Sequence, residues 1–144
     1  MAAAEVVYAT DASDLRPSEL EGFFVDWPSP PTPETHLEVL RGSDHVVLAR
    51  ESGGRVVGFV TAVGDGVLAA YIPLLEVLPA WQGRGVGTEL VRLLLDELRG
   101  LYMVDLVCDD TLEPFYARFG MIPLRAMALR NRSALAPKTR LVRL

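Results

Sequence analysis

The chain has 144 residues, a formal net charge of −5, a hydrophobic fraction of 50% and a charged fraction of 23%. These values predict one folded domain over residues 1–144 and argue against general nucleic-acid binding, which needs a basic face. Cys108 is the single cysteine, so neither a disulfide framework nor a Cys/His metal cluster is expected, and we predict no metal cofactor.

The N-terminal residues M-A-A-A-E-V-V-Y lack the basic start and long apolar run of a signal peptide. No apolar run in the chain approaches the length of a membrane span. We therefore expect a cytoplasmic protein without a membrane partner.

The first third of the chain predicts one strand and two helices. Residues 5–9 read as a strand, and Asp11 or Ser13 is suited to cap a helix that ends near Phe24. Four prolines in the next stretch predict a stiff, extended loop that leads into a short helix at about 33–41.

The middle of the chain predicts a run of hairpin strands and then a helix. Residues 45–51 and 55–63 form two strands around a Ser-Gly-Gly turn, and a Gly-Asp-Gly turn precedes a long apolar strand at 67–78. Apolar residues at helical spacing then predict a helix from about Gly87 to Arg99.

The last third of the chain predicts a strand at 102–108 and a short helix from Leu112 to Phe119. Two final strands are expected near 122–130 and 139–143. Hairpin strands followed by strand–helix–strand units indicate an α+β fold, with a mixed, twisted central sheet and helices layered on both faces.

A glycine-rich turn at residues 77–88, V-L-P-A-W-Q-G-R-G-V-G-T, joins the long strand to the long helix. Its glycines allow positive φ angles and close approach of the backbone to a ligand. The first amides of a helix lack partners within the helix and carry partial positive charge. Together these features predict an anion site, most naturally for a phosphate. A P-loop is excluded because no lysine follows the glycines, and Thr88 replaces the third glycine of a dinucleotide fingerprint.

The remaining pattern is Q-x-x-G-x-G, formed by Gln82, Gly85 and Gly87. It resembles the coenzyme A pyrophosphate loop of the GCN5-related N-acetyltransferase (GNAT) family. The preceding L-L-E-V-L-P and the later P-F-Y-A-R-F-G-M also look like segments of that family, so the resemblance spans about residues 55–123. It implies a GNAT-like sheet, acetyl-CoA as cosubstrate, and acetyl transfer to a primary amine, expected to be a small molecule, by direct attack in a ternary complex. A homodimer is also possible, since dimers are common among relatives.

The resemblance also implies which residues hold the cofactor. A backbone N–H near Val77 would polarise the thioester oxygen, at a bulge where the strand parts from its neighbour. The pyrophosphate would lie on the amides of Gln82, Gly83, Arg84, Gly85, Val86, Gly87 and Thr88.

Two residues are the candidates for proton transfer. Tyr116 occupies the family's tyrosine position in F-Y-A-R-F-G, where the resemblance implies a general acid that protonates the leaving thiolate; core packing is the alternative. Glu76 interrupts an apolar strand directly before the cofactor edge. A carboxylate there is costly unless it is paired or faces a cleft, so we predict a base or an amine-binding anion, with an ion pair to an arginine as the alternative.

Other residues are candidates for the acceptor site. These are Tyr71 on the long strand, Asp109 and Asp110 after the next strand, and Trp27 in the proline-rich loop. Asp109 and Asp110 can equally cap the following helix, and Trp27 can equally cover the core. His36 and His45 are expected at the surface or in a pocket wall, and Cys108 as an inert core thiol.

Two other functions fit parts of this pattern. One is a non-catalytic acyl-CoA-binding or regulatory module on the same fold, because binding needs only the loop. The other is a dinucleotide-binding domain, which requires the glycine loop to follow the first strand of a parallel sheet.

Overall fold

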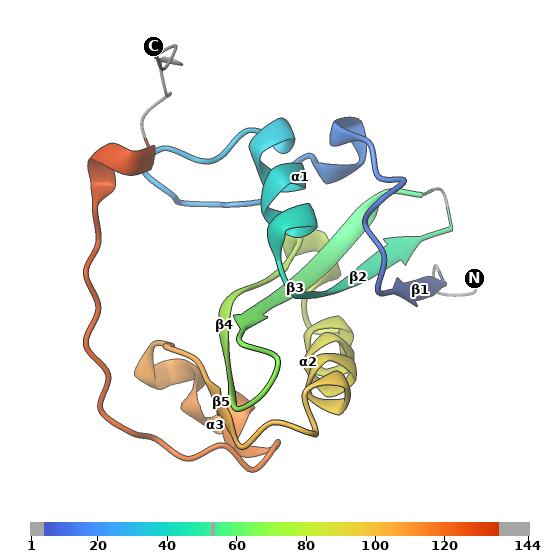
Figure 1. Cartoon of the computed structure of the whole chain (residues 1–144). Coiled ribbons are helices and arrows are strands. Elements are labelled where there is room, and N and C mark those ends of the chain that lie inside the picture. Colours follow the sequence, from blue (N-terminus) through green and yellow to red (C-terminus); the bar gives the residue numbers. More distant parts are fainter. Residues whose placement is uncertain (1–4, 53, 136–144) are drawn as a thin grey trace.

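The computed structural model describes residues 5–52 and 54–135, and five strands form one sheet (Figure 1). The strands follow one another in the order β1 (Val6–Ala9), β2 (His45–Glu51), β3 (Val56–Gly64), β4 (Ala69–Val77) and β5 (Met103–Asp105). The first four are antiparallel, and β5 is parallel to β4. The predicted mixed sheet is confirmed, and the antiparallel hairpins before the glycine loop exclude the dinucleotide-binding fold.

Among the residues that the structure describes, three α-helices and four short 3₁₀ turns accompany the sheet. They are η1 (Pro17–Leu20), α1 (Pro33–Gly42), η2 (Pro79–Trp81), α2 (Val86–Glu97), η3 (Asp110–Leu112), α3 (Glu113–Ala117) and η4 (Arg132–Leu135). The predicted helices at 33–41 and 87–99 correspond to α1 and α2. Thr32 caps α1 by accepting a hydrogen bond from the Thr35 amide at 3.2 Å, and Pro33 starts the helix.

Helices cover both faces of the sheet, as predicted. Successive side chains of β3 point to opposite faces, so neighbouring residues of this strand contact different helices. The Phe59 ring packs against His36 of α1, with 4.3 Å between ring centroids. A side chain on the neighbouring Gly58 would instead meet Leu90 of α2 at 3.0 Å. Glycine at position 58 therefore lets α2 pack closely on one face while aromatic residues fill the other.

Strands β4 and β5 separate soon after they meet. Their ladder joins only residues 69–71 to 103–105, while β4 continues to Val77. Leu78 N–H donates to Val57 O of β3 at 2.8 Å, so by antiparallel alternation the amide positions at 73, 75 and 77 face away from β3. Residue 73 is Pro73, which has no N–H to offer β5. The edge of β4 beyond Tyr71 is therefore left uncovered by β5.

The predicted helix up to Phe24 is wrong, because only the 3₁₀ turn η1 forms in this region. Gly22 and Phe24 have φ angles of 92° and 62°, which no α-helix accommodates. The Asp11 carboxylate accepts hydrogen bonds from the amide and hydroxyl of Ser13 instead of capping a helix. An ion pair between Glu19 and Arg50 ties η1 to β2.

Two strand predictions near the C-terminus also need correction. The predicted strand 102–108 is shortened to β5, because the ladder with β4 includes only residues 103–105. Residues 122–130 form no strand, since the described chain provides no neighbouring strand for them. The predicted strand 139–143 lies outside the described residues. Within residues 5–52 and 54–135, no helix combines the length and apolarity needed to cross a bilayer.

Candidate functional site

The turn after β4 is held in place by the Gln82 side chain. Its Nε2 donates to the Val77 carbonyl at 3.1 Å, which ties the loop to the end of the strand. The amides of Trp81 and Gln82 bond to Leu78 O and Pro79 O within η2. The backbone N–H of Gln82 is therefore used inside the turn, and its side chain secures the loop.

The next residues open the backbone toward solvent at the start of α2. Gly83 and Gly85 have φ angles of 75° and 82°, and a Cβ at either position would meet no atom within 4 Å. Gly85 is the N-cap of α2, and Val86 begins the helix and is buried in the core. The first amides of α2 therefore lie next to open space, as an anion site requires.

Gly87 is the packed glycine of this loop. A Cβ there would lie 3.7 Å from Val77 Cγ2 and 3.9 Å from Phe115 Cζ. The start of α2 is thereby placed beside the last residue of β4, whose N–H faces away from β3. The Val77 amide and the first turn of α2 are therefore neighbouring groups of donors.

Two arginines flank this helix start. The Arg84 guanidinium lies over the Trp81 ring, 5.0 Å from its centroid. Arg118 was not among the predicted site residues, yet its Nη2 donates to Thr88 Oγ1 at 2.9 Å and its guanidinium lies 5.2 Å from the Phe115 ring centroid. Its place two residues after Tyr116 in F-Y-A-R-F-G was the available signal.

This arrangement fits the diphosphate of coenzyme A. It offers open amides without obstructing side chains, the positive end of a 12-residue helix, and two cationic groups at its border. Beside it runs the uncovered edge of β4, whose outward amides match the hydrogen-bonding needs of an extended amide-containing chain.

Glu76 lies on the face of the sheet covered by α1. It is the cross-strand partner of Phe59, and its Oε1 accepts a hydrogen bond from the Phe24 amide at 2.9 Å. Its Oε2 is buried and has no hydrogen-bond partner in the described chain, and burial raises the pKa of this carboxyl. The ion-pair alternative is wrong for the described residues, in which Glu76 forms no salt bridge.

His36 is buried in the same aromatic region, so its predicted place at the surface or in a pocket wall is wrong. Its side chain packs among Phe23, Phe24 and Phe59, and the residue is 1% exposed. Neither ring nitrogen has a partner in the described structure, and burial lowers its pKa to about 4. The imidazole is therefore neutral at physiological pH.

Tyr116 lines a second region, a cavity of about 1240 Å³ between β5, α3 and the segment after α3. The residue is 9% exposed, and burial is the main cause that raises the pKa of its phenol, followed by the Cys108 charge. Tyr71 and Asp110 line the same cavity. Cys108 lines it as well and is only half-buried, so it is not the core thiol we expected; its pKa is raised, mainly by burial.

The remaining predicted acceptor residues occupy separate places. Asp109 stands at the N-cap of η3, where its carbonyl accepts from the Leu112 amide and its side chain makes no capping bond. Trp27 is partly exposed and packs edge-on against the Phe24 ring, with 4.9 Å between ring centroids. Trp27 and Glu76 thus both contact Phe24, whereas Tyr71, Asp110 and Tyr116 line one cavity.

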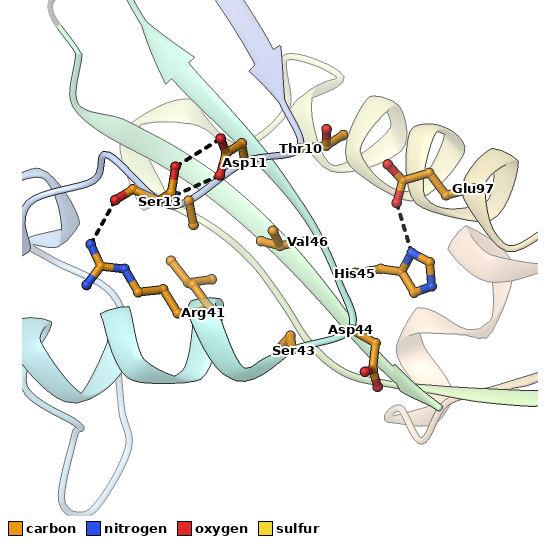
Figure 2. A pocket seen from close by; sticks show the side chains of 11 residues that line it. Thr10, Asp11, Ser13, Arg41, Ser43, Asp44, His45, Val46 and Glu97 are labelled. Atoms are coloured by element: carbon orange, nitrogen blue, oxygen red, sulfur yellow. Dashed lines mark hydrogen bonds and ion pairs between the residues drawn. The ribbon is translucent and has the colours of Figure 1, made fainter. Parts of the chain in front are cut away.

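Another cavity, of about 670 Å³, contains none of the predicted site residues (Figure 2). Its polar groups bond to one another: Arg41 Nη2 donates to Ser13 O at 3.1 Å, and His45 Nδ1 lies 3.2 Å from Glu97 Oε2. Figure 2 shows these contacts joining the chain before η1, the end of α1, β2 and α2. We interpret this cavity as a gap between packed elements and not as a binding site. His45 lies in its wall, as predicted.

The chain is similar to known acetyltransferases. The model of the Acetyltransferase (GNAT) family matches residues 12–121. N-alpha-acetyltransferase RimI of Mycobacterium tuberculosis is 40% identical over 96 residues, which cover 63% of this chain but only 60% of that relative. A crystal structure of a provisionally assigned acetyltransferase from Deinococcus radiodurans R1 is 48% identical, with a TM-score of 0.89 over 93% of this chain and 94% of its own. A GNAT family acetyltransferase from Streptococcus pneumoniae TIGR4 is 25% identical, with a TM-score of 0.71 over 89% and 99% of the two chains.

The family match covers most of the chain, and it includes the glycine loop, Glu76 and Tyr116. On this evidence the chain belongs to the acetyltransferase (GNAT) family and is an acyltransferase.

Proposed function

We propose that this protein is an N-acetyltransferase that transfers the acetyl group of acetyl-CoA to a primary amine by direct attack in a ternary complex. The observation that carries the proposal is the open helix start at Gly83–Thr88, placed beside the uncovered edge of β4. Acetyl-CoA is the cosubstrate of the family, and it supplies an activated thioester that an amine attacks without a covalent enzyme intermediate.

The cofactor-binding residues in this proposal are those at the β4–α2 junction. The amides of residues 83–88 would hold the diphosphate, and Arg84 and Arg118 would add positive charge. The Gln82 side chain would hold the loop against the end of β4. The Val77 amide would donate to the thioester oxygen, where negative charge develops during attack.

Glu76 is the proposed base. A primary amine has a pKa near that of lysine, about 10.4, so it arrives protonated and must lose a proton before attack. Glu76 has one carboxylate oxygen held by the Phe24 amide and the other buried without a partner, which leaves that oxygen available to accept a hydrogen bond or a proton. Its raised pKa makes it a stronger base than an exposed carboxylate.

Tyr116 is the proposed acid. Its phenol is protonated at neutral pH, and the raised pKa strengthens this preference. It shares its cavity with Tyr71 and Asp110, which we propose contribute to the acceptor side together with Asp109 and Trp27. The proton donated by the phenol would neutralise the leaving thiolate.

Two classes of acceptor follow from different observations. We propose a small primary amine, in line with a chain that carries net negative charge. The similarity to an N-alpha-acetyltransferase favours a second class, the α-amine at the start of a polypeptide. The two classes differ in the group attached to the amine, which is a small molecule in one class and a polypeptide in the other. A substrate panel therefore distinguishes them.

The test is a thiol-release assay with acetyl-CoA and a panel of small amines and short peptides with free N-termini. We expect release of free CoA in proportion to amine acetylation, confirmed by the mass of the product. Calorimetric titration with CoA provides an independent measure of binding. Binding without turnover on any amine would favour the non-catalytic acyl-CoA-binding alternative, and an absence of binding would overturn the proposal.

A further inference from the structure

The helix that carries Tyr116 is short and has few bonds to the rest of the molecule. α3 (Glu113–Ala117) has five residues, and helices shorter than about 12–15 residues are marginal in water on their own. Within the part of the chain that the structure describes, one hydrogen bond joins residues 113–120 to a distant element, and it runs from Arg118 to Thr88. The placement of Tyr116 therefore depends on the side chains that connect α3 to its neighbours.

Phe115 is the residue of α3 that approaches the start of α2. A Cβ on Gly87, the second residue of α2, would lie 3.9 Å from Phe115 Cζ, which is ordinary van der Waals contact. The same ring packs edge-on against the Tyr116 ring, with 4.9 Å between centroids, and against the Phe119 ring, with 5.5 Å. Phe115 therefore contacts both the first turn of α2 and the ring that carries the phenol.

Arg118 reinforces this contact from the end of α3. Because Phe115 and Arg118 are three residues apart in helical chain, their side chains lie on the same face. The Arg118 guanidinium lies 5.2 Å from the Phe115 ring centroid, and its Nη2 donates to Thr88 Oγ1 at 2.9 Å. A planar guanidinium can stack on an aromatic ring while its edge donates hydrogen bonds. Arg118 therefore ties the Phe115 ring to α2.

The partner of Arg118 on α2 is the third residue of that helix. The N-cap of α2 is Gly85, which has no side chain to cap the helix, and the Thr88 hydroxyl bonds to Arg118 instead of to its own helix. The Thr88 amide, in contrast, is among those that we propose hold the diphosphate. Thr88 thus offers its backbone to the proposed cofactor site and its side chain to α3.

We propose that Arg118 is a positioning residue for the acid step of acetyl transfer and acts through Tyr116. Its bond to Thr88 and its contact with Phe115 fix α3 against the start of α2, so that the phenol stays within reach of the leaving sulfur. A group transfers its proton only within hydrogen-bond distance, and a misplacement of about 1 Å can lower a rate by about 10²-fold. This role needs the Thr88 hydroxyl, whereas the positive charge that Arg118 offers the diphosphate does not. The inference rests on the proposed function, because it requires the cofactor site and the acid role of Tyr116.

The test removes the hydroxyl and keeps both the Thr88 amide and the Arg118 charge. Thr88→Val should lower kcat by about tenfold, because the phenol is less often in place, while the Kd for CoA in calorimetry stays unchanged. The melting temperature should change little, since the lost bond is exposed. Thr88→Ser keeps the hydroxyl and should restore kcat. Thr35→Val is the matched control: Thr35 is the third residue of α1, and its hydroxyl bonds to Thr32, so all three quantities should match those of the wild type.

A double-mutant cycle with Tyr116→Phe distinguishes positioning from a merely structural role. If Arg118 acts through the phenol, adding Thr88→Val to Tyr116→Phe should lower kcat no further. Losses that add in the double variant, or a Thr88→Val variant with a weaker Kd for CoA and full kcat, would overturn the inference. Full activity of Thr88→Val in an active wild-type background would overturn this inference alone. A wild-type protein without turnover on any amine would overturn the proposed function and this inference together.

Discussion

The two sides of the carboxyl end of β4 are built in opposite ways. On the side of α2, backbone amides face open space around glycines that no side chain obstructs. On the side of α1, the Glu76 carboxylate lies among aromatic rings, bonded to the amide of Phe24 from a distant part of the chain. We call the first side, the backbone amides of residues 83–88, the cradle, and the second side, the buried side chains around Glu76, the aromatic region.

This difference in construction assigns cofactor binding to the α2 side of β4 and proton transfer to the α1 side. Backbone amides in water bind an anion without changing protonation, so the cradle is suited to hold a diphosphate. Burial changes the protonation equilibrium of a carboxyl group, so the aromatic region is suited to move a proton. Substitutions on the two sides should therefore change different measured quantities.

The largest expected effect is that of Glu76→Gln. The amide keeps the acceptor for the Phe24 N–H but cannot take up a proton, so we expect kcat/KM to fall by about 10²–10⁴-fold. In the wild-type protein, kcat/KM should rise with pH through the raised pKa of Glu76, and this dependence should be lost in the variant. Binding of CoA, measured by calorimetry, should be unchanged.

Stability gives a second readout for the same variant. The folded-state pKa of Glu76 lies above its ordinary value of 4.5, so its contribution to stability is present below pH 4.5 and is lost as the pH rises through the folded pKa. Glu76→Gln should therefore raise the melting temperature most at neutral pH, with a difference that narrows in acid. Glu38→Gln, at an exposed position on α1, is the control and should change neither quantity. Equal activity of Glu76→Gln and wild type would remove Glu76 as the base.

The next effect in size is that of Tyr116→Phe. Removal of the phenol oxygen should lower kcat by about 10²-fold, because the leaving thiolate then takes its proton from solvent. The melting temperature should change little, since the ring remains in place. Tyr8→Phe, on β1, is the matched control. Full activity of Tyr116→Phe would favour the core-packing interpretation of this residue.

A smaller effect is expected for Gly85→Ala, in the cradle. A φ of 82° is unfavourable for alanine by roughly 1–2 kcal/mol, so the free energy of unfolding should fall by about that amount. If the loop relaxes instead, its amides turn and the affinity for CoA should fall by up to about tenfold. Gly100→Ala, in the turn after α2, lacks the positive φ and serves as the control. The cradle would be in doubt if both alanine variants behaved like wild type.

The contrast between the two sides also explains what the sequence could predict. The cradle could be predicted because its residues are close in sequence: Gln82, Gly85 and the start of α2 form one specific pattern. The partner of Glu76 is 52 residues away, on a backbone with positive φ at Phe24, and no periodic pattern indicates that contact. Alternation did identify Glu76 itself, because a carboxylate that interrupts an apolar strand needs an explanation.

The incorrect strand predictions at 102–108 and 122–130 have a different physical cause. Residues 122–130 have the composition of a strand, but a strand exists only where a neighbour completes its hydrogen bonds, and the described chain provides none. The short ladder of β5 was predictable in principle from Pro73, whose missing N–H ends pairing on that edge of β4. Propensity therefore predicts the strand character of a segment without saying which chain supplies its partner.

The smallest effect on activity is expected for His36→Phe, which tests whether the aromatic region is as dry as its packing indicates. The folded-state pKa of His36 is about 4, below its ordinary value of 6.5, so in the wild-type protein its contribution to stability is present above pH 6.5 and is lost as the pH falls toward 4. His36→Phe should remove this loss and, by eliminating two buried nitrogens without partners, raise the free energy of unfolding at neutral pH by about 1 kcal/mol. Denaturant unfolding at several pH values measures both effects. Because phenylalanine keeps the ring contacts to Phe24, which in turn holds Glu76, kcat/KM should stay within a few-fold of wild type. A large loss of activity with unchanged stability would instead mean that the imidazole takes part in proton transfer with Glu76, and that the two sides of β4 share more chemistry than their construction indicates.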